Sequence, residues 1–174
     1  MNMPSLRGIR NDLDRARTSL LATASAFPDA HWKSVPGPGA WSAAEVIAHL
    51  SIVERTVVAG ARRIIGHPPK PVPLGRRFHI PVTLVRFRWR RVKSPLPLDS
   101  TLLAERDAML AEIQRVRLET LSFLHESSGR DLAPYRWPHP FLGSLNLYQW
   151  FGFLSNHERR HTKQLQEIVN RFRK

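Results

Sequence analysis

Two histidines near the C-terminus have a spacing that suits a metal site. His157 and His161 are four residues apart, so on a helix their side chains lie one turn apart on the same face. Two imidazoles in that arrangement can reach one metal ion. The same spacing also occurs in pairs of surface or half-buried histidines that bind nothing. The pair by itself therefore leaves both interpretations open.

The apolar residues around this pair favour the metal interpretation. Leu154, Leu165 and Ile168 fall near the same helical stripe as the two histidines, which predicts that the pair points into the protein. A buried imidazole needs a hydrogen-bond partner or a metal. His49, in an earlier helical stretch, is also predicted to lie on or beside an inward face. Facing helices of a bundle commonly build metal sites in its interior.

Four long stretches with helical periodicity must carry these residues. They run approximately over residues 5–26, 42–66, 99 or 100 to 127, and 144 to near the C-terminus. The segment from Ser42 to Glu45 has the form of a capping box that starts the second helix. The inward stripe of that helix is predicted to contain Ala44, Ile47 or Ala48, Ile52, Thr56, and Ala59 or Gly60. The chain of 174 residues is therefore predicted to be all-α, a four-helix bundle forming a single domain over residues 1–174.

A long basic connection separates the second and third predicted helices. Seven of the fourteen prolines lie between residues 66 and 98, and residues 55–98 contain eleven Lys or Arg and no Asp or Glu. The rest of the chain carries only about +2 of the net charge of +13. We call residues 67–98 the basic segment. Within it, the spacing over residues 80–92 fits either a short strand or a surface helix.

The basic segment suggests several partners. Within residues 70–93, basic residues are interleaved with Phe78, Phe87 and Trp89, a combination that can bind nucleic acid, although that is the less favoured partner here. It can also bind an anionic membrane surface or a protein, steer an anionic substrate, or form a solvated loop whose aromatics pack on the bundle or in a homodimer. The alternative to an enzyme is therefore a non-catalytic stress-response or binding protein that uses residues 70–93 as its contact surface.

Several classes of protein are excluded by composition. The sequence contains no cysteine, so it has no disulfides, thiolate metal ligands or cysteine nucleophile. No apolar run approaches the ~20 residues that a transmembrane helix needs. The N-terminal MNMPSLRGIR is not followed by the apolar core of a secretory signal. We expect a soluble cytoplasmic protein.

Two blocks of sequence resemble the DinB/YfiT-like superfamily. The block WSAAEVIAHL (residues 41–50) matches its W-S-x-x-E-x-x-x-H-L pattern at the start of the second helix. The blocks HPFLGSL (139–145) and HERRHTKQ (157–164) match its H-P-x-x-G-x-L … H-x-x-x-H-x-x-Q pattern. The resemblance covers the chain except the basic segment. It implies a four-helix bundle with a divalent metal on His49, His157 and His161.

Such a ligand set implies an enzyme acting on a small-molecule substrate. Three neutral imidazoles leave the charge of the cation in place and a coordination position open, as in catalytic sites. A coordinated water would have its pKa lowered toward about 7, or a substrate thiol could be held as thiolate. The resemblance accordingly implies a hydrolase or a thiol S-transferase. Imidazole ligands favour zinc or nickel, and iron and manganese also fit.

Some polar and aromatic residues could assist this site. Glu45 could orient His49 or act as a base, although its capping role already explains it. Gln164 could donate or accept a hydrogen bond at a ligand, and Glu54 could face the pocket or pair with an arginine. His139, in a Pro-flanked loop, is expected to be structural. Core or loop anchoring is the favoured role of the tryptophans, namely Trp41, Trp137 and Trp150.

Overall fold

A computed structural model describes residues 5–69, 71, 73, 79–87 and 103–172. The predicted four-helix bundle is confirmed, with helices α1 (Leu6–Ser25), α2 (Ala43–Ile65), α3 (Arg106–Glu126) and α4 (Leu147–Phe172). The other described elements are the strands β1 (Arg136–His139) and β2 (Gly143–Asn146), and the 3-10 helices η1 (Asp29–His31) and η3 (Val82–Arg86). No helix in the described ranges is long and apolar enough to cross a membrane.

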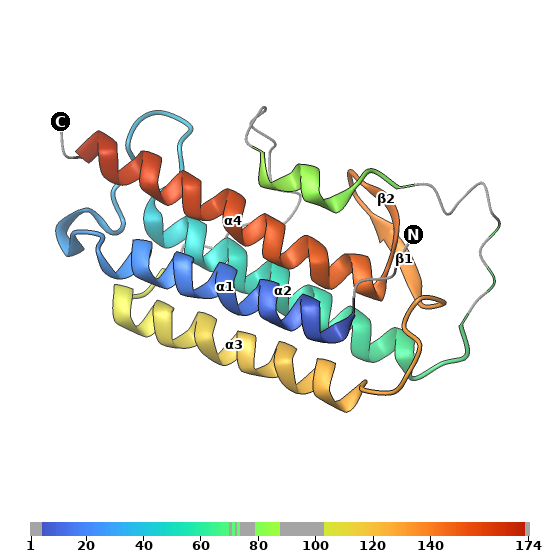
Figure 1. The fold of residues 1–174 in the computed structure, drawn as a ribbon. Coiled ribbons are helices and arrows are strands. Elements are labelled where there is room, and N and C mark those ends of the chain that lie inside the picture. Colours follow the sequence, from blue (N-terminus) through green and yellow to red (C-terminus); the bar gives the residue numbers. More distant parts are fainter. Residues whose placement is uncertain (1–4, 70, 72, 74–78, 88–102, 173–174) are drawn as a thin grey trace.

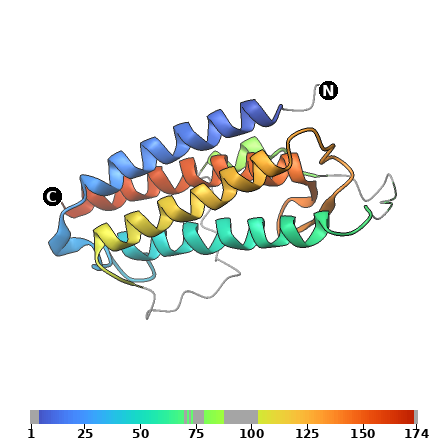
Figure 2. The ribbon, with the colours of Figure 1, turned by 90° about the horizontal axis from the view of Figure 1, so that it is seen from below.

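The order of the helices around the bundle explains the long connection. α1 packs beside α4, α2 packs beside α3, and α4 and α2 also contact each other, as Figures 1 and 2 show. In Figure 1, α2 and α3 run in the same direction, and so do α1 and α4. A short turn cannot join two parallel neighbours. The chain between α2 and α3 must therefore return along a helix of 23 residues, which is about 35 Å long.

Side-chain caps begin three of the helices. The hydroxyl of Ser5 accepts a hydrogen bond from the amide of Gly8 at α1. The predicted capping box is present at α2, where Ser42 and Glu45 each accept from the other's amide. Before α4, the Asn146 and Gln149 side chains accept from each other's amides in the same way, at 2.9 and 2.8 Å. These caps satisfy amides that have no partner inside the helix.

Two predicted helix starts are wrong. The third helix was expected from Asp99 or Ser100, which lie outside the described residues, but Leu103 and Glu105 are not helical and α3 begins at Arg106. Glu105 adopts an extended backbone conformation as the N-cap. The fourth helix was expected from near Ser144, but residues 143–146 form β2, which pairs antiparallel with β1. Cross-strand pairing there occupies the backbone groups that a helix would use.

The predicted inward stripe of α2 is correct only in its first half. Ala44, Ile47 and Ala48 are buried, whereas Thr56 and Ala59 are exposed. The predicted stripe advances four residues at a time. On a helix of 3.6 residues per turn, each such step turns about 40° further around the axis, so the later positions of the stripe point away from the core. The buried face in the second half consists of Val53, Glu54, Val57, Val58 and Ala61.

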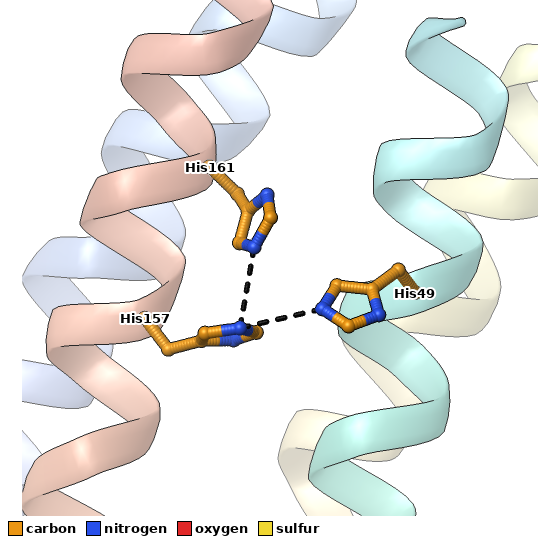
Figure 3. A group of neighbouring side chains, drawn as sticks. All are labelled: His49, His157 and His161. Atoms are coloured by element: carbon orange, nitrogen blue, oxygen red, sulfur yellow. Dashed lines mark hydrogen bonds between the residues drawn. The ribbon is translucent and has the colours of Figure 1, made fainter. Parts of the chain in front are cut away.

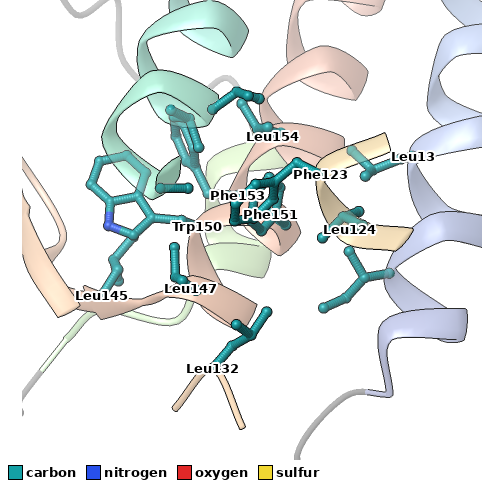
Figure 4. Close-up of a cluster of buried hydrophobic side chains, with 14 of the residues drawn as sticks. Leu13, Phe123, Leu124, Leu132, Leu145, Leu147, Trp150, Phe151, Phe153 and Leu154 are labelled. Carbon is teal, nitrogen blue, oxygen red and sulfur yellow. The ribbon is translucent and has the colours of Figure 1, made fainter. Parts of the chain in front are cut away.

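The apolar core has two clusters, one toward each end of the bundle. The cluster near the β-hairpin, part of which is drawn in Figure 4, includes Phe151 and Phe123, whose rings stack at 5.5 Å. The other cluster includes Phe27, Trp32 and Ile47. Buried charged side chains lie between the two clusters in the sequences of α1, α3 and α4, namely Arg17, Arg117 and Glu158, and a fourth, Glu54, directly follows the first hairpin-end cluster residue of α2, Val53.

Residues 79–87 of the basic segment lie along α4. The Ile80 amide donates to the Leu142 carbonyl at 2.9 Å, and the Gln149 side-chain amide is 2.8 Å from Nε2 of His79. Residues 82–86 form η3, so this part of the 80–92 stretch is helical. Most of the basic side chains on which a contact surface was predicted lie outside the described residues, namely Arg76, Arg77, Arg88, Arg90, Arg91 and Lys93.

Candidate metal centre

The three histidines of the predicted ligand set lie together between α2 and α4. His49 projects from α2, while His157 and His161 project from successive turns of α4, and the three rings converge in Figure 3. The Nε2 atom of His157 is 3.3 Å from that of His49 and 3.2 Å from that of His161. One nitrogen of each ring lies within 4.8 Å of the others.

This donor set fits a divalent metal ion. One imidazole nitrogen carries either one proton or one lone pair, so Nε2 of His157 cannot make a good hydrogen bond to both neighbours at once. A cation shared by three lone pairs removes that conflict. Two nitrogens bound to zinc at about 2.1 Å in a tetrahedral arrangement lie about 3.4 Å apart. The two short separations are therefore close to those that a bound metal would require.

The surroundings keep two of these rings neutral near pH 7. Burial lowers the pKa of His49 to about 4. Burial also lowers the pKa of His157 well below its usual value, and the nearby His161, His49 and Arg160 side chains add to the effect. Only the neutral form of an imidazole has a free lone pair for a metal. His49 and His161 are buried, and His157 is partly buried.

Aromatic rings enclose the cluster. The Trp41 ring lies 5.0 Å from that of His49 and is nearly parallel to that of His161 at 6.1 Å. The Phe153 ring stacks on His157 at 5.0 Å. Trp41 packs against the core cluster that contains Trp32 and Ile47, as expected of a core anchor, and its ring also forms one wall of the histidine cluster. Apolar walls exclude water from a site and strengthen the electrostatic interactions inside it.

The other residues considered from sequence lie in different settings. The carboxylate of Glu45 accepts from the amide and hydroxyl of Ser42, at 2.7 and 2.9 Å. Glu54 is buried and pairs with arginines, one of its two predicted alternatives. Nδ1 of His139 accepts from the Phe141 amide at 3.1 Å. Trp137 and Trp150 stack on each other at 4.6 Å at the hairpin end of the bundle.

Sequence reasoning did not single out three buried charged residues near this site. Arg17, Arg117 and Glu158 are each less than a tenth exposed. Each lies three or four residues from buried apolar positions of its own helix, such as Leu13 and Leu154. A charged residue on an apolar stripe is the signal that could have found them, because such a residue is rarely buried without a partner.

Comparisons with known proteins agree with this fold. A family model for the DinB superfamily matches residues 12–165. The uncharacterized protein YuaE of Bacillus subtilis (strain 168) is 26% identical over 134 residues, which is 76% of this chain and 80% of that protein. The crystal structure of TT2238, a four-helix bundle protein, covers 94% of this chain and 99% of its own, with a TM-score of 0.63 and 23% identity.

A second solved structure is similar over nearly the whole chain. YfiT from Bacillus subtilis, described as a probable metal-dependent hydrolase with an unusual four-helix bundle topology, gives a TM-score of 0.68 at 13% identity. The match covers 99% of this chain and 90% of that chain. At these identities the two structures support the fold, whereas the family model covers most of the sequence itself. The chain belongs to the DinB superfamily.

Proposed function

We propose that this protein is a metal-dependent enzyme that acts on a small molecule through a divalent ion held by His49, His157 and His161. The observation that carries the proposal is the convergence of three Nε2 atoms from two helices. Imidazole binds a metal in its neutral form, so a bound ion would keep its full charge. When bound, such an ion supplies Lewis-acid activation of a water or a thiol.

The chain's own residues prepare this site. Nδ1 of His161 lies 2.9 Å from the carbonyl oxygen of the Gln164 side chain, which can only accept, so the proton sits on Nδ1 and the Nε2 lone pair faces the cluster. Trp41 and Phe153 cover opposite parts of the cluster.

Hydrolysis is the reaction that we favour, with transfer of a small thiol as the alternative. The similarity to YfiT, described as a probable metal-dependent hydrolase, supports hydrolysis. Imidazole ligands suit zinc or nickel best among the common divalent ions, with iron or manganese also accepted. Two substrate screens of the metal-loaded protein separate the reactions. Turnover of esters or amides indicates hydrolysis, and turnover of thiol and electrophile pairs indicates thiol transfer.

Metal analysis of protein purified without a metal-affinity tag tests the proposal directly. The wild type should hold about one transition-metal ion per chain, as expected for a single three-histidine site. His157→Ala and His161→Ala should lose it, and any turnover with it. His125→Ala, which changes an exposed histidine of α3, is the matched control and should keep both. A wild type that holds no metal after reconstitution with zinc, nickel, iron and manganese would rule the proposal out.

A further inference from the structure

Four charged side chains meet in the centre of the bundle, one from each helix. We call them the charge ring: Arg17 of α1, Glu54 of α2, Arg117 of α3 and Glu158 of α4. All four are between 2% and 6% exposed. Two positive and two negative charges balance, so the ring is electrically neutral. In α1, α3 and α4 its residues lie in sequence between those of the two apolar clusters.

Each carboxylate of the ring contacts both guanidinium groups. Glu54 lies 2.8 Å from Nη2 of Arg17 and 2.7 Å from Nε of Arg117. Glu158 lies 2.5 Å from Nε of Arg17 and 2.7 Å from Nη2 of Arg117. Because charged hydrogen bonds of this kind are directional, the four contacts fix the positions of the four helices relative to one another.

The remaining polar atoms of the ring also have partners. Nη1 of Arg117 donates to the Leu13 carbonyl at 2.5 Å, and Nη1 of Arg17 donates to the Ile113 carbonyl. The Thr120 hydroxyl donates to Glu54 at 2.7 Å. Burial alone would raise the pKa of Glu54, but Arg117, Arg17 and Thr120 outweigh it and lower that pKa. The Glu54 carboxylate is therefore charged near neutral pH.

The ring is arranged around the two helices that carry the histidines. Both carboxylates come from α2 and α4, and both guanidiniums come from α1 and α3, so each arginine joins α2 to α4. Glu54 follows His49 by five residues and Glu158 directly follows His157. A slide of either helix by one turn, about 5.4 Å, would break the ring and separate the Nε2 atoms of His49 and His157.

Stability alone does not account for such a ring. A fully buried ion network contributes little net free energy of folding, and replacing it with apolar residues of similar volume is often neutral or stabilising. Its best-attested effect is to select one register of packed helices. In this bundle, the register of α2 against α4 is what brings His49 to the other two histidines.

We propose that the charge ring is a positioning device for the histidine cluster. It holds α2 and α4 in the one register and rotation at which the three imidazole nitrogens converge. Loss of the ring should therefore lower the metal affinity more strongly than it lowers the stability of the fold. The proposal rests on the metal site proposed above, although its geometric part can be measured without any metal.

The test replaces the ring with apolar residues and leaves the rest of the core unchanged. The quadruple variant Arg17→Met, Glu54→Leu, Arg117→Met, Glu158→Leu should remain folded, as measured by circular dichroism and thermal unfolding. Leu13→Ala is the matched control, because it weakens the core next to the ring without altering a ring side chain. If the quadruple variant does not fold, the single variant Glu158→Gln replaces it in the same comparison.

Two measurements on these proteins decide the outcome. The chain lacks cysteine, so spin labels at Thr56→Cys on α2 and Lys163→Cys on α4, two exposed positions, report one inter-helix distance in the metal-free protein. Zinc titration against a competing chelator reports affinity. We expect the ring variant to give a broadened or shifted distance and at least about tenfold weaker zinc binding, whereas Leu13→Ala keeps the wild-type distance and affinity.

The proposal would be overturned if the ring variant kept the wild-type label distance and zinc affinity. It would also be overturned if Leu13→Ala changed the distance and weakened zinc binding as much as the ring variant does. The label distance also separates this proposal from the proposed function. A wild type that binds no zinc contradicts the metal site, while an altered distance in the metal-free ring variant still supports the positioning role of the ring.

Discussion

The carbonyl oxygen of the Gln164 side chain lies 2.9 Å from Nδ1 of His161. Gln164 is one helical turn beyond His161 on α4, so the contact is set by the helix itself. It fixes which nitrogen of the ring carries the proton. It also limits rotation of the imidazole ring about its side-chain bonds, which keeps Nε2 directed at His157.

Removing this contact should weaken metal binding. Gln164→Leu leaves Nδ1 of His161 without its acceptor, so the ring loses both its preferred tautomer and its orientation. We expect metal affinity to fall by about 10- to 100-fold, the usual effect of losing such a partner. Competition with a chelator of known affinity measures the change.

The conservative variant provides the control. Gln164→Glu keeps an oxygen acceptor at the same position, and a carboxylate increases the basicity of the imidazole that it contacts. Its metal affinity should equal or exceed that of the wild type. If Gln164→Leu and Gln164→Glu bind metal equally well, the contact has no role in ligation.

The Trp41 ring provides an optical signal for the site. It lies 5.0 Å from the ring of His49, so a bound Ni²⁺ or Co²⁺ ion should quench its fluorescence. Titration of the metal-free wild type should reduce the emission until one ion per chain is bound. In Trp41→Phe the reduction should be much smaller, because Trp32 packs against Phe27 and Trp137 stacks on Trp150, outside the histidine cluster. Equal quenching in both proteins would place the ion away from the histidine cluster.

The capping box can be weakened without altering the cluster. Ser42→Ala removes the hydroxyl that accepts from the Glu45 amide at 3.2 Å. The free energy of unfolding should fall by about 1 kcal/mol, as for other N-cap serines, with the metal content unchanged. Chemical denaturation and metal analysis of the same preparation measure the two effects. Lost metal at unchanged stability would show that the cap acts on His49 and not on the helix end.

Much of the bundle could be predicted because its signals are local. The cap at Ser42, the stop at Gly66 and the spacing of His157 and His161 each depend on residues within one helix. The β-hairpin was missed because the proline within residues 136–139 weakens the strand signal. The pairing of residues 136–139 with residues 143–146 joins two separate segments, so a periodic pattern within one segment does not reveal it.

The charge ring was beyond prediction for a different reason. Glu54 was weighed as either a pocket residue or an ion-pair partner, and nothing in one helix could decide between them. The choice depends on Arg17 and Arg117, which are separated from it by 37 and 63 residues in the sequence. Which helices neighbour each other determines such pairs, and the parallel packing of α2 with α3 is set by the whole fold.

The metal-free protein should lose stability as the pH falls from about 6.5 to about 4, the range between the ordinary pKa of histidine and its value in the folded protein. Burial lowers the pKa of both His49 and His139 to about 4. Within this range the unfolded chain binds protons at these residues and the folded chain does not. Protonation therefore favours unfolding, and stability rises with pH up to about 6.5.

His139→Gln isolates one part of this effect without changing a proposed ligand. The free energy of unfolding is measured by denaturant at several pH values across the range. It should depend less steeply on pH in the variant, and the difference in slope should correspond to the uptake of up to about one proton on unfolding. His67→Gln, which changes an exposed histidine, should leave the slope as in the wild type. Parallel curves for His139→Gln and the wild type would show that His139 is not kept neutral by burial, and would leave His49 and His157 as the source of the acid sensitivity.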